Sequence, residues 1–235
     1  MSQITTVSFF HYTTFLNKYW GFKMMRLAMP SLKKIKGSSF SKLMGSGRDD
    51  GFNNNPDWSA YCLIQVWDKE ENALAFFKHS ELMTGFRMHT FEIWTLYLKS
   101  ISTKGEWSAQ QPFQVSSTID TTNLFIGVIT RATIKWNYLR KFWNSVPKSH
   151  IALENNKDLV FSKGIGEILF LQIATFTLWN NLDAMKKFAY KSSEHSEVIK
   201  KTREFEWFDE ELFSRFQPYL SVGTWNGLNP LPELK

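Results

Sequence analysis

The second half of the chain contains the segments Phe161-Ser-Lys-Gly-Ile-Gly-Glu167 and Leu171-Gln-Ile-Ala-Thr-Phe-Thr-Leu-Trp179, and both have counterparts in the first half. Phe40-Ser-Lys42 matches the start of the first segment, and a strand-like run ending at Trp67 matches the second. Further matches keep the same order: Phe76 with Phe188, His79-Ser-Glu81 with His195-Ser-Glu197, and Lys104-Gly-Glu-Trp107 with Val222-Gly-Thr-Trp225. The shift stays at about 110 to 120 residues, so two copies of one unit are the economical explanation.

Each copy is predicted to run strand, helix, strand, strand, helix, strand, from the alternation of apolar and polar positions and from helix-start signals. In the first copy we expect strands over 5–12, 39–45, 60–67 and 95–102, and helices over 15–29 and 71–91. In the second copy we expect strands over 124–134, 159–166, 171–179 and 213–222, and helices over 138–154 and 182–208.

The predicted fold class is therefore α+β, with two tandem ferredoxin-like units of the dimeric α+β barrel type whose antiparallel sheets pack face to face. The expected division is an N-terminal unit over 1–102, a linker over 103–123 and a C-terminal unit over 124–235. The linker is rich in Ser, Thr and Gln and contains Pro112, which is typical of a connecting segment.

Composition predicts a folded chain with a substantial core, because 43% of its 235 residues are apolar. No apolar run approaches the roughly 20 residues that span a bilayer, and no secretory leader is evident, so we expect a cytoplasmic protein. Cys62 is the single cysteine and is interpreted as a small buried hydrophobe. Aromatic residues make up 16% of the chain, and they either line a cavity for a flat ligand or fill an ordinary core.

The net charge of +6 is uneven, because residues 1–47 contain no Asp or Glu and seven Lys or Arg. The predicted helix over 15–29 mixes cations with Trp20 and Phe22, a pattern that suits contact with an anionic membrane surface. A solvated basic helix face is the plainer alternative. Nucleic acid is not expected as a partner, since no motif of a nucleic-acid-binding fold accompanies the charge.

Common catalytic motifs are missing from the sequence: there is no Walker loop, zinc-type Cys pair, His-Glu-x-x-His pair or nucleophile elbow. Gly164-Ile-Gly166 is too short for a dinucleotide fingerprint. None of the five histidines has a second histidine at a chelating interval, which argues against a metal held by several side chains. Haem remains open, because the porphyrin needs only one axial protein ligand.

The ordered set of motifs in the second half resembles the spheroidene monooxygenase family. The motifs that carry the resemblance are Phe161-Ser-Lys-Gly-Ile-Gly-Glu167, Thr175-Phe-Thr-Leu-Trp179, Ala184-Met-Lys-Lys-Phe-Ala189, His195 and Trp207-Phe-Asp-Glu-Glu-Leu-Phe-Ser-Arg-Phe216. Phe40-Ser-Lys-Leu-Met-Gly-Ser-Gly47 adds a resemblance in the first half. The stretch Tyr190 to Glu194 departs from the Gly-Pro pair expected there. Chlorite dismutases and aldoxime dehydratases are similar in plan, with haem held by a histidine of the second unit.

The resemblance implies a haem-dependent monooxygenase that uses haem b, O2 and a ferredoxin-like electron donor to oxidise an apolar carotenoid, giving a hydroxyl or a ketone. It implies that His195 is the iron ligand. We place Arg131 as a catalytic residue on the distal side, because alternate residues of its strand should face the cavity between the sheets; an outward Arg on a strand edge is the alternative. The residues expected to contact the cofactor are His195, Lys163, Gly164, Gly166, Arg203 and Trp207.

Two other functions are compatible with the same fold: a haem enzyme of different chemistry, such as a dehydratase or peroxidase-like protein, and a cofactor-free ligand-binding protein. Solvated positions are the alternative for Lys163 and Arg203, and a histidine packed at a helix edge is the alternative for His195. The sequence leaves open the oxidised carbon and whether the chain forms a homodimer.

Overall fold

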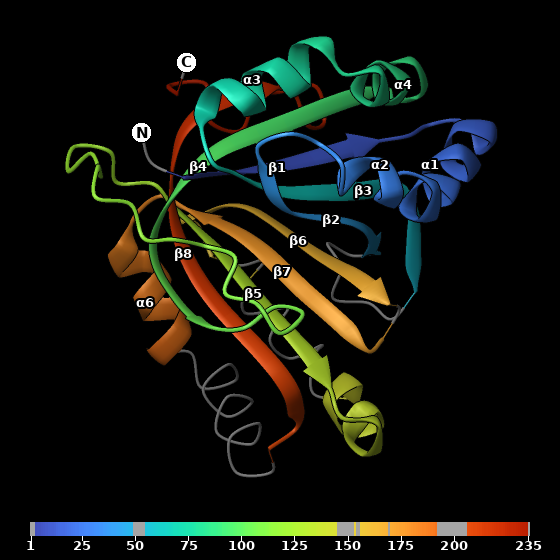
Figure 1. Ribbon diagram of the computed structural model, residues 1–235. Helices are drawn as coiled ribbons and strands as arrows, with labels where there is room; N and C mark the ends of the chain where they lie inside the picture. Colours follow the sequence, from blue (N-terminus) through green and yellow to red (C-terminus); the bar gives the residue numbers. More distant parts are fainter. Residues whose placement is uncertain are drawn as a thin grey trace.

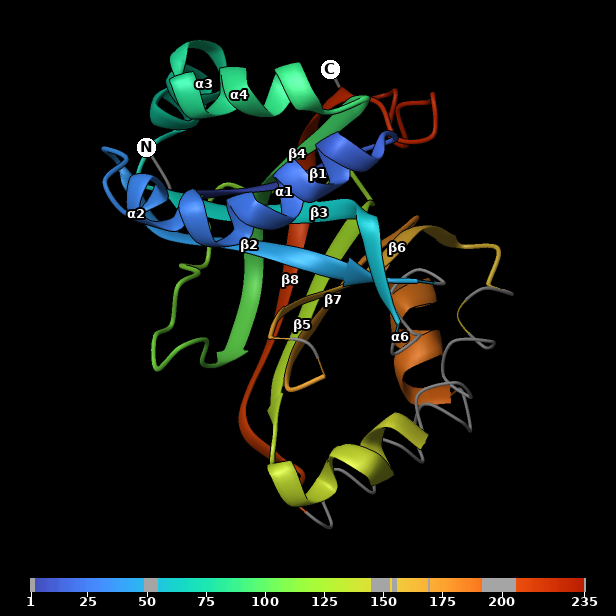
Figure 2. The ribbon, with the colours of Figure 1, turned by 90° about the vertical axis from the view of Figure 1, so that its right-hand side faces the viewer.

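The computed structural model describes residues 3–48, 55–144, 153, 156–168, 170–191 and 206–234. Eight antiparallel strands form one closed barrel in the order β1-β3-β2-β6-β7-β5-β8-β4 (Figure 1). Helices α1 to α4 cover the barrel on the side of the first four strands, and α6 lies on the side of the last four (Figure 2). No helix in the described part of the chain is long and apolar enough to cross a membrane.

The first half provides four strands and four helices, and most agree with the predicted ranges. Its elements are β1 (Ile4–His11), α1 (Phe15–Leu27), α2 (Met29–Leu32), β2 (Ser38–Gly47), β3 (Pro56–Trp67), α3 (Glu70–His79), α4 (Glu81–His89) and β4 (Glu92–Gly105). The single helix predicted over 71–91 is wrong in one respect. Ser80 has extended backbone angles, so the chain turns there and forms two helices.

The second half follows the same plan. Its elements are β5 (Ile126–Ile134), the 3-10 turn η2 (Trp136–Tyr138), a helical stretch over 139–144, β6 (Leu159–Ile168), β7 (Gln172–Trp179), α6 (Leu182–Lys191) and β8 (Phe208–Gly223). The helix predicted up to Phe208 is wrong at its end. Glu210, Leu212 and Phe216 occupy alternate positions of β8, and β8 pairs with β5 along this whole stretch. The period of two therefore sets the structure of these residues, although they are rich in Glu.

The strand order is the same in both halves, β4-β1-β3-β2 and β8-β5-β7-β6. The α+β class and the antiparallel pairing are confirmed, and the two tandem ferredoxin-like units stay a prediction. The sheets are joined at both edges, which differs from two separate sheets packed face to face. A long β4–β8 ladder from Trp94↔Gly223 to Gly105↔Leu212 makes one seam, and the pairs Gly45↔Gly166 and Ser46↔Ile165 make the other.

Aromatic and aliphatic side chains fill the inside of the barrel. Phe9 lies at the centre of a group of rings, with ring centroids 4.9 to 5.8 Å from those of Phe161, Trp94, Trp225 and Phe176. Cys62 is buried in the same core, as predicted. The rings inside the barrel thus pack against one another as an ordinary core does.

The segment after β4 also enters this core. β4 continues to Gly105, and both Trp107 and Phe113 are buried against the rings of the barrel interior. The predicted division into 1–102, 103–123 and 124–235 stays a prediction, but the first part of the expected linker is strand and core.

Candidate functional site

Successive residues of β5 point to opposite sides of the barrel wall, and this separates the predicted site residues into two groups. Ile129 belongs to the interior core, and Arg131 lies on the same face two residues later. Thr130, between them, is exposed on the outer surface. The inner face carries charge within the packed barrel, whereas the outer face is exposed at Thr130.

Arg131 is 2% exposed, and carboxylates hold its charge. Its guanidinium forms an ion pair with Glu210, and its Nη2 atom lies 4.0 Å from Oε1 of Glu167. The guanidinium carbon lies 5.9 Å from the ring centroid of Trp107. A buried cation needs such partners, and the carboxylates supply them, although the buried Nε atom of Arg131 has no hydrogen-bond partner among the described residues. A catalytic role for Arg131 stays a prediction.

The same network ties the segment after β4 to the barrel. Lys42 lies 2.5 Å from Glu167 and donates a hydrogen bond to Ser108 at 2.7 Å. The indole of Trp107 donates to Glu167 at 2.6 Å, and the amide of Ala109 donates to Glu210 at 2.7 Å. We call Lys42, Arg131, Glu167 and Glu210 the interior ion network; two cations and two anions balance within it.

Burial alone would raise the pKa of Glu210, but the amides of Ala109 and Ser108 and the charge of Arg131 outweigh that effect. The pKa of Glu210 therefore lies below its ordinary range, and this carboxylate stays ionised at neutral pH. We therefore assign Glu210 to the ion pair with Arg131.

Lys163 also points into the barrel. Its ammonium lies 3.4 Å from Asp57, at the start of β3. The pKa of Asp57 is lowered, because hydrogen bonds from Ser59 and the charge of Lys163 outweigh the opposite effect of burial. Lys163 thus contacts a carboxylate of the first half.

On the outer face, four residues form one row across the second-half sheet. Gly164 of β6 pairs with Thr175 of β7, which pairs with Thr130 of β5, which pairs with Phe213 of β8. Thr130 is exposed, Thr175 is half-buried and Phe213 is 39% exposed. The centre of this sheet face is therefore reachable from outside.

Apolar clusters border this row at both ends. At one end, Trp179 and Val128 pack against Ala184 and Met185 of α6. At the other end, Trp207 packs with Ile134 and Phe142, and its ring is stacked 6.4 Å from that of Tyr138. Figures 1 and 2 show α6 and the helical stretch after β5 at different ends of these strands.

Two further rows extend the central one into a floor between the clusters, and several of their residues, such as Ser162, Gly166 and Ala132, are small. The rows next to the central one contribute Ser162, Thr177 and Val128 on one side, and Gly166, Ile173 and Ala132 on the other. The hydroxyl of Ser162 is buried and has no hydrogen-bond partner among the described residues. We call this floor, with Gly164, Thr175, Thr130 and Phe213, the outer cradle.

The matching row of the first half shows what makes the cradle. Counted from Phe40 and Trp67, the counterparts of Gly164 and Thr175 are Leu43 and Leu63. These leucines and their neighbour Ser8 are buried in the core under α1 to α4, and Ser8 bonds to Thr95 at 2.8 Å. Replacing two leucines by Gly and Thr removes most of the side-chain volume from this row.

The same plan of sheet and helices therefore has a buried outer row in the first half and a row with exposed Thr130 and Phe213 in the second. The hollow of about 360 Å³ on the first-half side lies between α4 and the neighbouring strands, beside Met83, Phe91 and Tyr97. Glu92 at its edge is bound by His11, Thr224 and two amides of the C-terminal turn. Arg87, the other charged residue of that hollow, donates a hydrogen bond to the carbonyl oxygen of Phe77, so structural contacts account for both charged groups.

Similarity to known proteins agrees with this architecture. The chain is 34% identical over 236 residues to spheroidene monooxygenase of Cereibacter sphaeroides, covering 98% of this chain and 71% of the relative. It belongs to the spheroidene monooxygenase family. The Rhodobacter capsulatus member is 30% identical over 97% of this chain and 95% of its own length. No family model matches the chain.

Among solved structures, an aldoxime dehydratase is similar in fold, with a TM-score of 0.64 over 92% of this chain and 81% of that protein. A second aldoxime dehydratase, in complex with butyraldoxime, gives a TM-score of 0.62. Sequence identity is 10% and 9%, so these similarities concern the fold alone. They agree with the observed α+β plan of this member of the family.

The predicted site residues separate as follows. Gly164 and Gly166 lie on the cradle floor and Trp207 in one bordering cluster, whereas Lys163 and Arg131 lie on the opposite face of the same strands. His195 and Arg203 lie outside the described residues. The roles of all seven residues stay predictions.

Sequence reasoning missed Thr130, Thr175 and Phe213, which the pairing register brings into one row. The sequence around Thr130 contained a usable signal. Successive strand residues point to opposite faces, so if Ile129 and Arg131 face inward, Thr130 between them must face outward. It also missed Lys42, Glu167 and Glu210. Nothing local in the sequence shows that residues so far apart would share one ion network.

Proposed function

We propose that this chain is a haem-dependent monooxygenase that oxidises a carotenoid, with O2 as co-substrate and a ferredoxin-like protein as electron donor. The substrate class rests on family membership, because the relatives are named spheroidene monooxygenases. The cofactor and its position rest on the outer cradle. The repeated strand order supports building the chain from two tandem ferredoxin-like units.

The cradle suits a flat, largely apolar group. Gly164 and Gly166 have no side chains that would project from the sheet. The clusters that contain Trp179 and Trp207 lie on either side of them. No cluster of three or more His, Cys, Asp or Glu occurs among the described residues, and haem needs none, because one axial ligand is enough. The family resemblance assigns that role to His195, four residues after the end of α6.

Haem b, when bound, would supply the iron at which O2 is activated. In the overall reaction one oxygen atom enters a C–H bond of the carotenoid as a hydroxyl. The other leaves as water, with two electrons from the donor and two protons from solvent. A second oxidation of the same carbon gives a geminal diol, which loses water to form the ketone.

This chain's own residues would hold and shield the reactants. The hydroxyls of Thr130 and Thr175 point outward from the floor and can donate hydrogen bonds to a polar atom bound above them. Phe213 continues the floor on β8 and would exclude water from that side. The interior ion network acts on the other face of these strands, where it fixes the position of β5, β6 and β8 under the cradle.

The first test is an ultraviolet-visible spectrum of the purified protein after haem addition, then reduced and exposed to carbon monoxide. We expect a Soret band that shifts in both steps. His195→Ala should lose this spectrum, and the matched control His79→Ala, its counterpart in the first half, should keep it. A full spectrum in His195→Ala would overturn the ligand assignment.

A second variant tests the cradle itself. Thr130→Trp would place a large ring on the floor and is expected to prevent haem binding without lowering the melting temperature, because the position is exposed. Thr84→Trp, at an exposed site on α4, is the control for adding a Trp. Equal haem binding by both variants would place the cofactor elsewhere.

The substrate is tested by supplying the holoenzyme with reductant, O2 and an acyclic carotenoid. A hydroxylated or ketone product supports the proposal. A haem spectrum with untouched carotenoid would indicate a haem enzyme of different chemistry, and a colourless protein that rejects haem would indicate a ligand-binding protein of the same fold.

A further inference from the structure

Helix α1 is apolar on both of its faces. Its inward face packs Trp20, Met24 and Met25 against the first-half sheet, and Gly21 allows the closest approach. A Cβ atom at Gly21 would lie 3.0 Å from the rings of Tyr12 and Tyr61. This tight packing fixes which side of the helix faces away from the barrel.

The outward side carries large apolar residues where polar ones are usual. Phe15 is 81% exposed and Leu16 is 76% exposed. The full set, which we call the α1 outer face, is Phe15, Leu16, Tyr19, Phe22 and Leu27. At 100° per residue these positions fall within one side of the helix, and the exposed cations Lys23 and Arg26 lie on the same side between them.

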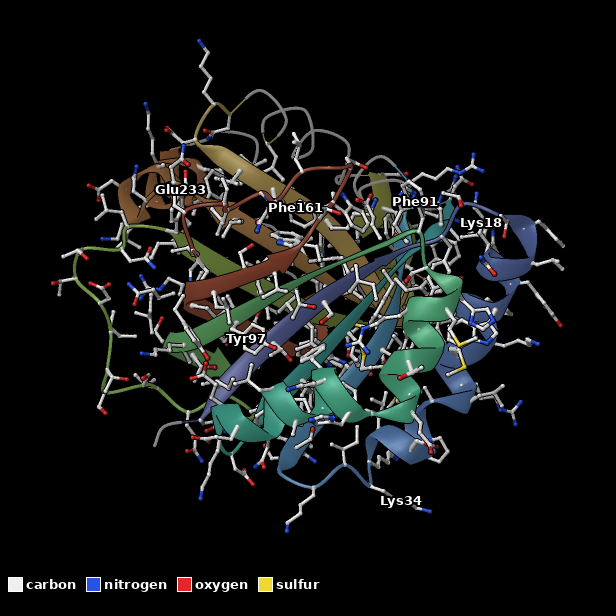
Figure 3. The ribbon with its side chains drawn as sticks, turned by 90° about the horizontal axis from the view of Figure 1, so that it is seen from above. Lys18, Lys34, Phe91, Tyr97, Phe161 and Glu233 are labelled. Atoms are coloured by element: carbon white, nitrogen blue, oxygen red, sulfur yellow. The ribbon has the colours of Figure 1, made fainter. Side chains whose placement is uncertain are left out.

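Neighbouring elements extend this surface. The ring of Phe22 lies 5.0 Å from that of Trp58, which is itself exposed on β3. Trp20 stacks at 4.1 Å on His89, the last residue of α4, and that end of α4 exposes Met88. Figure 3 shows Phe91, also exposed, close to the end of α1 that carries Lys18.

Positive charge lies within and around the α1 outer face. The cations of α1, α2 and the turn that follows are Lys18, Lys23, Arg26, Lys33, Lys34 and Lys36. Within the described part of the chain none of these six makes an ion pair, and residues 1–47 contain no Asp or Glu. Figure 3 shows Lys18 and Lys34 on the same side of the molecule.

We propose that the α1 outer face and its cations bind the surface of an anionic lipid bilayer. Exposed rings and aliphatic side chains between unpaired cations are the composition of a helix that lies in the membrane interface. The apolar residues would enter the boundary of the acyl chains, and the cations would contact lipid phosphates.

Charge argues against a second copy of the chain as the occupant. A two-fold interface through α1 would bring the cations of one helix against those of the other, with no acidic residue of this segment to offset them. An anionic membrane offers the opposite charge over the whole surface. It also accepts Phe15 and Leu16 without requiring a shaped partner.

The test measures cosedimentation of the full chain with vesicles of phosphatidylcholine, with or without phosphatidylglycerol. We expect binding that requires phosphatidylglycerol and weakens with added salt. Phe15→Ser/Tyr19→Ser/Phe22→Ser should weaken binding at least about 100-fold, because each apolar side chain leaves water on binding. The matched control is Leu74→Ser/Val115→Ser/Leu228→Ser, exposed apolar positions away from α1, which should bind as the original chain does.

A charge variant, Lys23→Gln/Arg26→Gln, changes two exposed cations and keeps the apolar residues. It should weaken binding about 30-fold, about fivefold for each cation near an anionic surface. Its control is Lys104→Gln/Lys157→Gln, two exposed lysines outside the first 47 residues. Equal binding by all variants would overturn the proposal. The proposal would also be overturned if the original chain does not bind vesicles but forms a dimer that Phe15→Ser/Tyr19→Ser/Phe22→Ser abolishes. Neither measurement uses haem or carotenoid, so the result is independent of the proposed function.

Discussion

Removal of Arg131 should destabilise the protein, because Arg131 is the buried cation of the interior ion network. Arg131→Met keeps the apolar stem but leaves Glu210 and Glu167 with one positive partner, Lys42. Breaking a buried ion pair costs about 3 to 5 kcal/mol. Because both carboxylates keep about one fifth of their exposure, we expect the lower end, about 3 kcal/mol. For a chain of this length that corresponds to a fall in melting temperature of about 6 to 12 °C.

A double-mutant cycle separates the pair from its surroundings. Glu210→Gln should cost about 1 to 2 kcal/mol, because the amide oxygen can still accept the hydrogen bond from Ala109. Arg131→Met/Glu210→Gln removes both charges of the pair, so no charge is left without its partner. The double variant should therefore cost about 2 kcal/mol less than the sum of the single variants. Urea unfolding followed by fluorescence measures all four free energies.

The control cycle uses Lys135 and Glu206, whose charged atoms lie 3.9 Å apart at an exposed site. Its coupling should be below about 0.5 kcal/mol. Additive behaviour of the Arg131 cycle, within the same limit, would refute the structural role. If Arg131→Met leaves the melting temperature unchanged but stops carotenoid oxidation, Arg131 belongs to the reacting site, as strand alternation predicted.

Two further predictions concern acid stability and turns. Glu210 and Asp57 have folded pKa values below their ordinary 4.5 and 3.8. Their contribution to the free energy of unfolding is therefore present above those ordinary values and is lost as the pH falls through the lower folded pKa. Glu210→Gln and Asp57→Asn should flatten the acid side of a plot of melting temperature against pH, and an unchanged plot would contradict the assignment. Gly105 and Gly227 both have positive φ angles, but a Cβ would meet the carbonyl oxygen of Glu211 at Gly105 and nothing at Gly227. Gly227→Ala should therefore cost about 1 kcal/mol and Gly105→Ala more than about 3 kcal/mol in urea unfolding, and equal costs would show that the backbone contact is unimportant.

Much of the fold was predictable because it depends on local periodicity. The strands ending at Trp67 and Trp179 were predicted from alternating or apolar runs, and both exist with small shifts of their bounds. The break at Ser80 was missed, since its neighbours continue a helical pattern. The start of β8 was missed as well. The acidic residues around Glu210 suit a helix locally, and only pairing with β5 makes them strand.

The candidate site was harder to predict, because it depends on register and not on motifs. Gly164 and Gly166 were recognised within a motif, but their position on an outer floor follows from the pairing of β6 with β7. Arg131 was expected to face a cavity between two sheets. Its direction was predicted correctly as inward, yet joining of the sheets at both seams leaves a packed interior there, with carboxylates as its partners.

Closure of the barrel explains why the site and the stabilising charges can occupy the same strands without competing. A strand of period two gives each face its own set of residues, so Thr130 can serve the cradle while Arg131 serves the core. The first half has the same backbone plan but fills the matching outer row with Leu43 and Leu63. At this row, the difference between a buried and an exposed outer face thus depends on side chains of the outer face alone. The two halves can thus differ on their outer faces while both contribute apolar residues to the shared interior.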